Sequence, residues 1–92
     1  MKGLFIINPS SGKQNIDSML REIMATLILD QICSHVDVFY TKGKDDAKNR
    51  AAELKPGDYD FIVSVGGDGT LNEVTNGLIL SAVSYTHLRA HE

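Results

Sequence analysis

Short apolar runs and amphipathic segments alternate along most of the chain. Residues 3–8 (GLFIIN) form an apolar run that ends at Asn-Pro, which is typical of a strand buried on both faces. Between residues 16 and 28, apolar side chains recur at alternating spacings of three and one, which predicts an amphipathic helix. Residues 35–41 (HVDVFYT) alternate between apolar and polar positions and predict a second strand.

The second half of the chain continues this alternation of strands and helices. A second helix is expected to begin at Asp45 and Asp46 and to end before Pro56, because proline interrupts helices. Residues 59–67 (YDFIVSVGG) predict a third strand and a turn, and residues 70–81 predict a third helix. Its buried side is expected to hold Leu71, Val74, Thr75 and Leu78.

This alternation predicts an α/β fold, with right-handed crossovers and a parallel sheet in three layers. Three strands make about half of a doubly wound sheet. We therefore expect an incomplete, Rossmann-like half domain with an unpaired sheet edge. The alternation of strands and helices does not determine the order of the strands in the sheet.

Composition narrows the functional classes. The chain has 92 residues, 42% of them hydrophobic, and a net charge of -3, which argues against a general nucleic-acid binder. Its one cysteine, Cys33, cannot form an internal disulfide, and the N-terminal apolar run is too short for a signal peptide. These features favour a cytoplasmic protein.

The last ten residues, 83–92 (VSYTHLRAHE), do not continue the pattern. Written as GTC TCT TAT ACA CAT CTC CGA GCC CAC GAG, their codons resemble a widely used transposon-based sequencing adapter. We therefore expect residues 1–81 to be natural sequence and residues 82–92 to be a non-native tail. His87 and His91 have the spacing of a metal pair on a helix, but nothing supplies a third ligand.

The most informative motif, GGDG at residues 66–69, lies between the third strand and the third helix. Glycines let a ligand approach the backbone, and a helix N-terminus attracts phosphate. Thr70 can cap the helix, with Glu73 as its capping-box partner. Asp68 would repel a phosphate unless Mg²⁺ lay between them.

Other interpretations of these loops stay open. GGDG can be a simple tight turn. It does not fit the dinucleotide motif, since Asn72 stands at the third glycine position, and residues 8–13 (NPSSGK) do not fit a Walker loop. The loop at residues 8–13 offers hydroxyls and a lysine to a polyphosphate, but it can also be a helix-entry turn. With Thr41 after the second strand, three polar loops follow the carboxyl ends of the strands and predict a nucleotide site. A shared site favours the first and third strands as neighbours, while the strand order stays open.

Together, NPSSGK and GGDGTLNEVTNGL (residues 66–78) resemble the catalytic domain of diacylglycerol kinases and related lipid kinases, including sphingosine kinases. The resemblance is closest to the bacterial soluble form and covers residues 1–81. NAD kinases and phosphofructokinases share GGDGT, but we do not expect LNEVTNGL after it in either of them.

The resemblance implies ATP-dependent, Mg²⁺-assisted phosphoryl transfer to a lipid hydroxyl, such as that of diacylglycerol at a membrane surface. It implies a cytoplasmic enzyme of phospholipid biosynthesis, peripheral at the inner membrane face, and it allows a homodimer. Lys13 would neutralise phosphate charge, Asp68 would organise Mg²⁺, and Glu73 would support the loop. The implied ATP site comprises Asn8, Pro9, Ser10, Ser11, Gly12, Lys13, Thr41, Gly66, Gly67, Asp68, Gly69, Thr70, Leu71 and Asn72.

The chain departs from the family in one large respect. The family has a further P-x-G-T-x-N-D segment and a second, β-rich domain that carries the general base and much of the lipid site. Neither occurs in this sequence, so we expect an N-terminal fragment that does not turn over lipid by itself. Two alternatives stay open: an NAD kinase-like enzyme acting on a small soluble substrate, and a non-catalytic nucleotide-binding module ending near Ser81.

Overall fold

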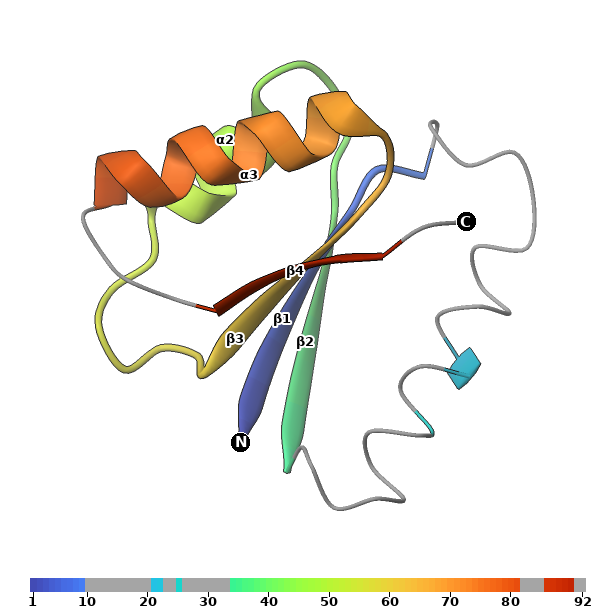
Figure 1. Ribbon diagram of the computed structural model, residues 1–92, viewed down its shortest axis with the longest axis vertical. Helices are drawn as coiled ribbons and strands as arrows, with labels where there is room; N and C mark the ends of the chain where they lie inside the picture. The colour runs from blue at the N-terminus through green and yellow to red at the C-terminus, as the bar shows by residue number, and fades with distance from the viewer. Residues whose placement is uncertain (10–20, 23–24, 26–33, 82–85, 91–92) are drawn as a thin grey trace.

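The protein is built around a parallel sheet. The computed structural model describes residues 1–9, 21–22, 25, 34–81 and 86–90. Within these ranges the strands are β1 (Lys2–Ile7), β2 (His35–Tyr40), β3 (Phe61–Val65) and β4 (Thr86–Ala90), and the helices are α2 (Asp46–Ala52) and α3 (Asp68–Ser81). The strand order is β2-β1-β3-β4, and every neighbouring pair is parallel (Figure 1). The predicted α/β class is confirmed, and so is the pairing of the first and third strands. The helix predicted over residues 16–28 and Cys33 lie mostly outside the described residues.

The apolar strands form the core. Leu4 and Ile6 of β1 join Ile62 of β3 in a cluster with buried side chains of both helices and the loop after α2: Ala47, Ala51, Leu54 and Val74. Phe5 and Ile7, which alternate with them along β1, are also fully buried. Burial of both faces explains the continuous apolar runs and is typical of a parallel sheet with cover on two sides.

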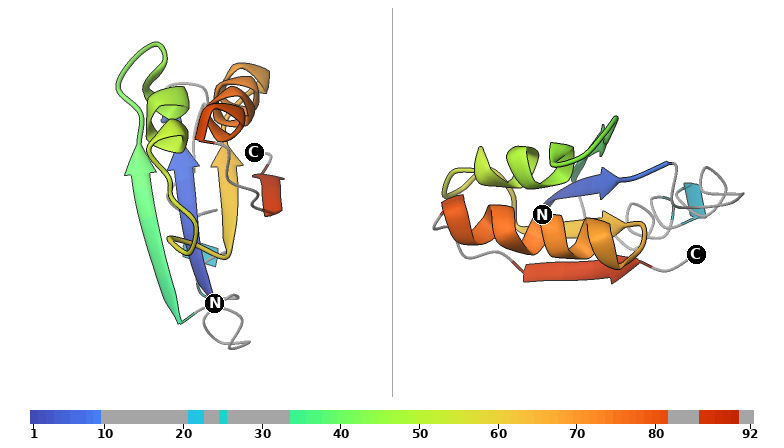
Figure 2. Two further views of the ribbon diagram at one scale, coloured as in Figure 1. Left: turned by 90° about the vertical axis from the view of Figure 1, so that its left-hand side faces the viewer. Right: turned by 90° about the horizontal axis from the view of Figure 1, so that it is seen from above.

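Helices α2 and α3 lie side by side on one face of the sheet (Figure 2), and small residues allow their close approach. A Cβ atom added at Gly77 of α3 would lie 2.3 Å from the Lys48 carbonyl oxygen and 2.6 Å from the Ala51 Cβ of α2. Gly77 is therefore a position at which the two helices pack too closely for a larger side chain. The exposed side chains of Ile79 and Leu80 follow it on the last turn of α3.

The start of α3 corrects a sequence-based expectation. The helix begins at Asp68, two residues before the predicted start, because Gly66 turns the chain with a φ of 151° and the Gly67 carbonyl accepts the Leu71 N–H at 3.2 Å. Thr70 thus lies inside the first turn, so the predicted capping role for Thr70 with Glu73 is wrong. The buried side also differs: it holds Thr70, Val74 and Gly77, with Leu71 and Leu78 half-buried and Thr75 exposed.

The expected unpaired edge is not found at β3. Thr86–Ala90 pairs in register with Phe61–Val65, so β3 is an internal strand with neighbours on both sides. This arrangement explains how all five β3 residues are buried. The non-native origin of residues 82–92 stays a prediction.

A polar network joins β2, α2 and the segment before β3. The Tyr59 hydroxyl donates to Asp37 Oδ2, and His35 Nε2 lies 2.8 Å from Asp37 Oδ1. The Arg50 guanidinium donates to the Tyr59 hydroxyl at 3.5 Å and lies 5.9 Å from the centre of the Phe39 ring. The hydrogen bond from Tyr59 lowers the pKa of Asp37, and burial raises the pKa of Tyr59.

Replacing Gly77 by alanine is expected to destabilise the fold. The new methyl group would meet a backbone oxygen that cannot move independently of α2. Overpacking typically costs about 1–3 kcal/mol, which outweighs the gain of about 1 kcal/mol in helix propensity. Urea unfolding should show a net loss on the order of 1 kcal/mol. Gly43→Ala is the control, since a Cβ there meets nothing within 4 Å; equal stability of the two variants would contradict this packing.

The Asp37 network predicts a pH dependence of stability. A lowered pKa in the folded state makes the carboxylate stabilising above its unfolded pKa of about 3.9, and this contribution is lost as pH falls through the folded value. The raised pKa of Tyr59 sets the opposite limit, because its contribution is lost as pH rises above about 10.

Thermal unfolding of Asp37→Asn is therefore expected to show lower stability than the parent chain at neutral pH. The difference should shrink below about pH 4, where the parent carboxyl also becomes neutral. Glu53→Gln, which removes an exposed carboxylate, serves as the control. A difference that stays constant with pH would show that the charge of Asp37 does not matter.

Candidate functional site

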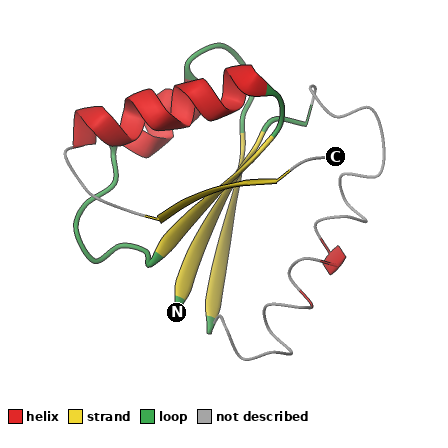
Figure 3. Cartoon of the chain, viewed as in Figure 1, coloured by secondary structure: helices red, strands yellow, loops and turns green. Residues whose placement is uncertain are grey.

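The carboxyl ends of β1, β2 and β3 bring three loops to one edge of the sheet (Figure 3). The Asn8 N–H donates to the Val65 carbonyl at 2.9 Å, which joins the loop after β1 to the end of β3. The Thr41 N–H donates to the Ile7 carbonyl at 2.8 Å, which joins the loop after β2 to the end of β1. The predicted convergence of these loops is therefore present at Asn8 and Thr41. Residues 10–13 of the first loop lie outside the described residues.

The GGDG segment forms the turn into α3. Positive φ at Gly66 suits glycine, since other residues seldom adopt it. A Cβ atom added at Gly67 or Gly69 would meet nothing within 4 Å, so the space around both glycines is open. The first N–H groups of a helix have no acceptor within it, and the helix dipole makes this end attractive to anions. The turn thus combines open space at two glycines with a helix end that attracts anions.

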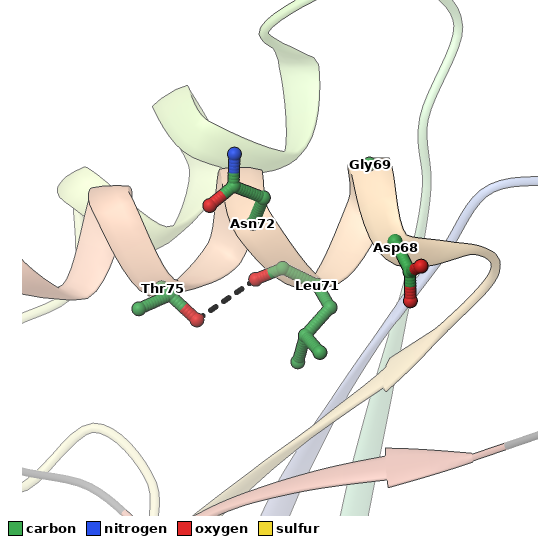
Figure 4. A pocket seen from close by; sticks show the side chains of 5 residues that line it. All are labelled: Asp68, Gly69, Leu71, Asn72 and Thr75. Carbon is green, nitrogen blue, oxygen red and sulfur yellow. Dashed lines mark hydrogen bonds between the residues drawn. The ribbon is translucent and has the colours of Figure 1, made fainter.

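A pocket of about 460 Å³ lies beside this helix end (Figure 4). Its lining residues all belong to the first two turns of α3: Asp68, Gly69, Leu71, Asn72 and Thr75. Four of these were expected at the site from the sequence. Thr70 is buried and does not line the pocket. Gly66 and Gly67 form the turn before the pocket, and Pro9 and Thr41 lie at the ends of the neighbouring strands.

Thr75 is the lining residue that sequence reasoning missed. Its hydroxyl donates to the Leu71 carbonyl at 2.8 Å, which leaves its oxygen lone pairs as acceptors. The sequence signal was its spacing of three and seven residues from Asn72 and Asp68, which places the three on one helix face. Because Thr75 was predicted to lie on the buried side of the helix, this spacing was not interpreted as part of a site.

The donor set at the pocket suits a cation shared with a ligand. Asp68 contributes a carboxylate and Asn72 an amide oxygen. Within the described part of the chain, no three His, Cys, Asp or Glu side chains gather to hold a metal ion. Mg²⁺ commonly binds through one or two carboxylates together with substrate phosphates and water. The residues present therefore fit Mg²⁺ only in company with a phosphate ligand.

A second pocket, of about 270 Å³, lies at the opposite end of the strands, where β1, β2 and β3 begin. It is lined by Lys2, His35, Asp37, Arg50, Gly57, Asp58 and Tyr59. Both Asp37 oxygens are occupied by Tyr59 and His35, and Asp58 Oδ2 accepts the Lys55 N–H at 3.0 Å. Parallel sheets bind ligands beyond the carboxyl ends of their strands. The pocket at α3 is therefore the better candidate site.

None of the helices in the described part of the chain combines the length and apolar character that crossing a membrane requires.

Comparisons with known proteins agree on one family. The profile of the diacylglycerol kinase catalytic domain matches residues 2–88. The chain is 37% identical over 73 residues to a diacylglycerol kinase from Staphylococcus haemolyticus, covering 79% of this chain and 22% of that protein. It is 41% identical over 75 residues to sphingoid long chain base kinase 4 from Schizosaccharomyces pombe, covering 82% of this chain and 16% of that protein.

Solved structures give the same result. A crystal structure of a diacylglycerol kinase from Bacillus anthracis matches 98% of this chain and 31% of its own, with a TM-score of 0.71 at 30% identity. A second structure from that organism matches 96% of this chain and 29% of its own, with a TM-score of 0.78 at 31% identity. The chain thus spans less than a third of the length of these relatives, and by its sequence match and its fold it belongs to the diacylglycerol kinase catalytic domain family.

Proposed function

We propose that this chain is the nucleotide-binding part of an ATP-dependent lipid kinase. The observation that carries the proposal is the pocket at the N-terminus of α3, where open glycine backbone, a helix end and Asp68 meet at the carboxyl edge of the sheet. The names of the relatives favour a lipid acceptor, such as diacylglycerol or a sphingoid base, over a small soluble acceptor such as NAD.

In this proposal, the chain positions the triphosphate of ATP. The N–H groups of Gly69 and Thr70 and the positive end of the α3 dipole attract phosphate oxygens. Lys13 would add a positive charge from the first loop. The other residues proposed to contact ATP from the first two loops are Asn8, Pro9, Ser10, Ser11, Gly12 and Thr41. Positioning and neutralising charge are most of what phosphoryl transfer requires from a protein.

Asp68 is the residue that would hold Mg²⁺, with Asn72 beside it. When bound, the ion would supply neutralisation of the negative charge on the phosphates. Without the ion, the Asp68 carboxylate would repel the phosphates, so the effect of Asp68 on ATP binding should depend on Mg²⁺. Gly66 and Gly67 shape the turn, and Leu71 lies on the pocket wall.

The reaction proposed for the longer protein transfers the γ-phosphoryl group of ATP to the acceptor hydroxyl. The new P–O bond forms as the bond to ADP breaks, and the hydroxyl proton passes to a general base. We propose that this base and most lipid contacts come from sequence that the longer relatives have in addition. The enzyme would be cytoplasmic and peripheral at the inner membrane face, with residues 82–92 as a foreign tail; homodimer formation is compatible with this scheme.

The Mg²⁺ dependence of ATP binding tests the site. With Mg²⁺, Asp68→Asn is expected to weaken ATP binding by about ten-fold, the value of one charge-assisted contact. With a chelator present, the same variant should bind ATP as well as the parent or better, since a repulsive charge is removed. Isothermal titration calorimetry on the 92-residue chain measures both.

Asp45→Asn is the matched control for this experiment. Asp45 is an exposed carboxylate in the loop after β2, outside the pocket, and its φ of 68° is one that asparagine tolerates. Its replacement should not change the Mg²⁺ dependence. Equal responses of the two variants, or an Asp68→Asn effect of the same sign with and without Mg²⁺, would contradict the proposed role of Asp68.

A further inference from the structure

The loop between β2 and α2 starts at the carboxyl edge of the sheet, where the candidate site lies. Its first residue, Thr41, is only 9% exposed, and the Thr41 N–H donates to the Ile7 carbonyl at 2.8 Å. Residues 42–45 are exposed and lead to Asp46, the first residue of α2. The loop therefore begins at a residue that is tied to β1, continues as exposed chain and ends at a helix.

The Asp46 carboxylate closes this loop on itself. One of its oxygens, Oδ2, accepts the Lys42 N–H at 2.7 Å and the Gly43 N–H at 3.1 Å. These two N–H groups directly follow Thr41 in the chain. Hydrogen bonds from backbone N–H groups to a carboxylate are stronger than those to a neutral acceptor. Asp46 thus holds the backbone on the side of Thr41 that leads away from the sheet.

The backbone of the loop brings the carboxylate to these groups. The Asp46 N–H donates to the Gly43 carbonyl at 3.3 Å, so residues 43–46 form a turn. Asp45, the third residue of this turn, has a φ of 68° and a ψ of 0°, in the left-handed region that aspartate adopts more readily than most residues. The chain reverses at Asp45, and the first residue of α2 therefore returns to the start of the loop.

These contacts continue the hydrogen bonds that join the strands. Thr41 is bonded to the last residue of β1, and the next residue along the chain from β1, Asn8, donates its N–H to the Val65 carbonyl at 2.9 Å. Val65 ends β3 and directly precedes the GGDG turn. Thr41 is therefore held by β1 on one side and by Asp46 on the other, and β1 is in turn joined to the turn into α3.

We propose that Asp46 is a positioning residue for the nucleotide site, because it holds the loop after β2 in the shape that places Thr41 beside the loops after β1 and β3. The inference rests on the proposed nucleotide-binding function and assigns a role to a residue outside the pocket at α3. Asp46 acts through Thr41, since its carboxylate is engaged with backbone N–H groups of its own loop. A displacement of about 1 Å can cost about a hundred-fold in rate at a site for group transfer.

Asp46 also has a purely structural effect that the test must separate from positioning. A carboxylate in the first turn of a helix interacts favourably with the helix dipole. Asp46→Glu keeps this charge but adds a methylene group, which displaces the carboxylate from the two N–H groups. Asp46→Asn removes the charge but keeps an oxygen that accepts hydrogen bonds at the same distance from the backbone. The two effects therefore predict opposite orders for these variants.

Calorimetric titration of the 92-residue chain with ATP in the presence of Mg²⁺ compares the variants. Asp46→Glu is expected to bind ATP about five-fold more weakly than the parent, the value of about one hydrogen bond, and Asp46→Asn should stay within about two-fold of the parent. Amide NMR signals of Lys42 and Gly43 should move in Asp46→Glu more than in Asp46→Asn.

Asp58→Glu is the matched control for this experiment. Asp58 Oδ2 also accepts a backbone N–H of its own loop, that of Lys55 at 3.0 Å, but this loop precedes β3 at the opposite end of the strands. Lengthening the side chain there changes the same kind of contact far from Thr41. ATP binding by Asp58→Glu should equal that of the parent.

Three outcomes would overturn the inference while the proposed function stands. They are parent-like ATP binding by Asp46→Glu, weaker binding by Asp46→Asn than by Asp46→Glu, and equal weakening by Asp46→Glu and Asp58→Glu. The second of these would show that only the charge at the start of α2 matters. Absence of ATP binding by the parent chain is a different result, because the proposed function then fails and the role of Asp46 fails with it.

Discussion

The parallel pairing of β1 with β3 is the constraint on which the rest of the structure depends. It joins residues separated by more than fifty positions in the chain and places the loops after both strands at one edge. The hydrogen bond between the Asn8 N–H and the Val65 carbonyl extends this pairing to the first residue of the loop. Both strands are buried on both faces, so a shift of register would expose or compress the core. The relative position of the loops is therefore as rigid as the sheet.

The candidate site follows from how β3 ends. Gly66 turns the chain sharply enough for α3 to begin at Asp68. The first residue of the helix therefore carries a carboxylate at the helix N-terminus. The other end of α3 is held against α2 through Gly77. Packing at one end of the helix thus fixes the direction in which its N-terminal N–H groups point. Fold stability and site geometry share these contacts.

Much of this arrangement could be predicted from local pattern. Continuous apolar runs identified β1 and β3, and the position of polar loops after the strands predicted the shared edge and the β1–β3 pairing. The start of α3 and the position of Thr70 in its first turn could not be predicted, because they depend on the backbone turn at Gly66 and not on side-chain periodicity. The position of Thr75 on the face of Asp68 and Asn72 could have been predicted from its spacing. The pairing of β4 was missed for another reason. Residues 86–90 show no local strand pattern, and their pairing depends on β3, which offers a free side for a neighbouring strand. The network of Asp37, Tyr59 and Arg50 requires tertiary contacts that no spacing reveals.

The most direct test of the account is a crystal structure of the chain with Mg²⁺ and a non-hydrolysable ATP analogue. The account predicts that the phosphates lie at the N-terminus of α3, within hydrogen-bond distance of the Gly69 or Thr70 N–H, with the metal ion between them and Asp68. Phosphates bound instead at the opposite edge of the sheet, beside Lys2 and Arg50, would contradict it.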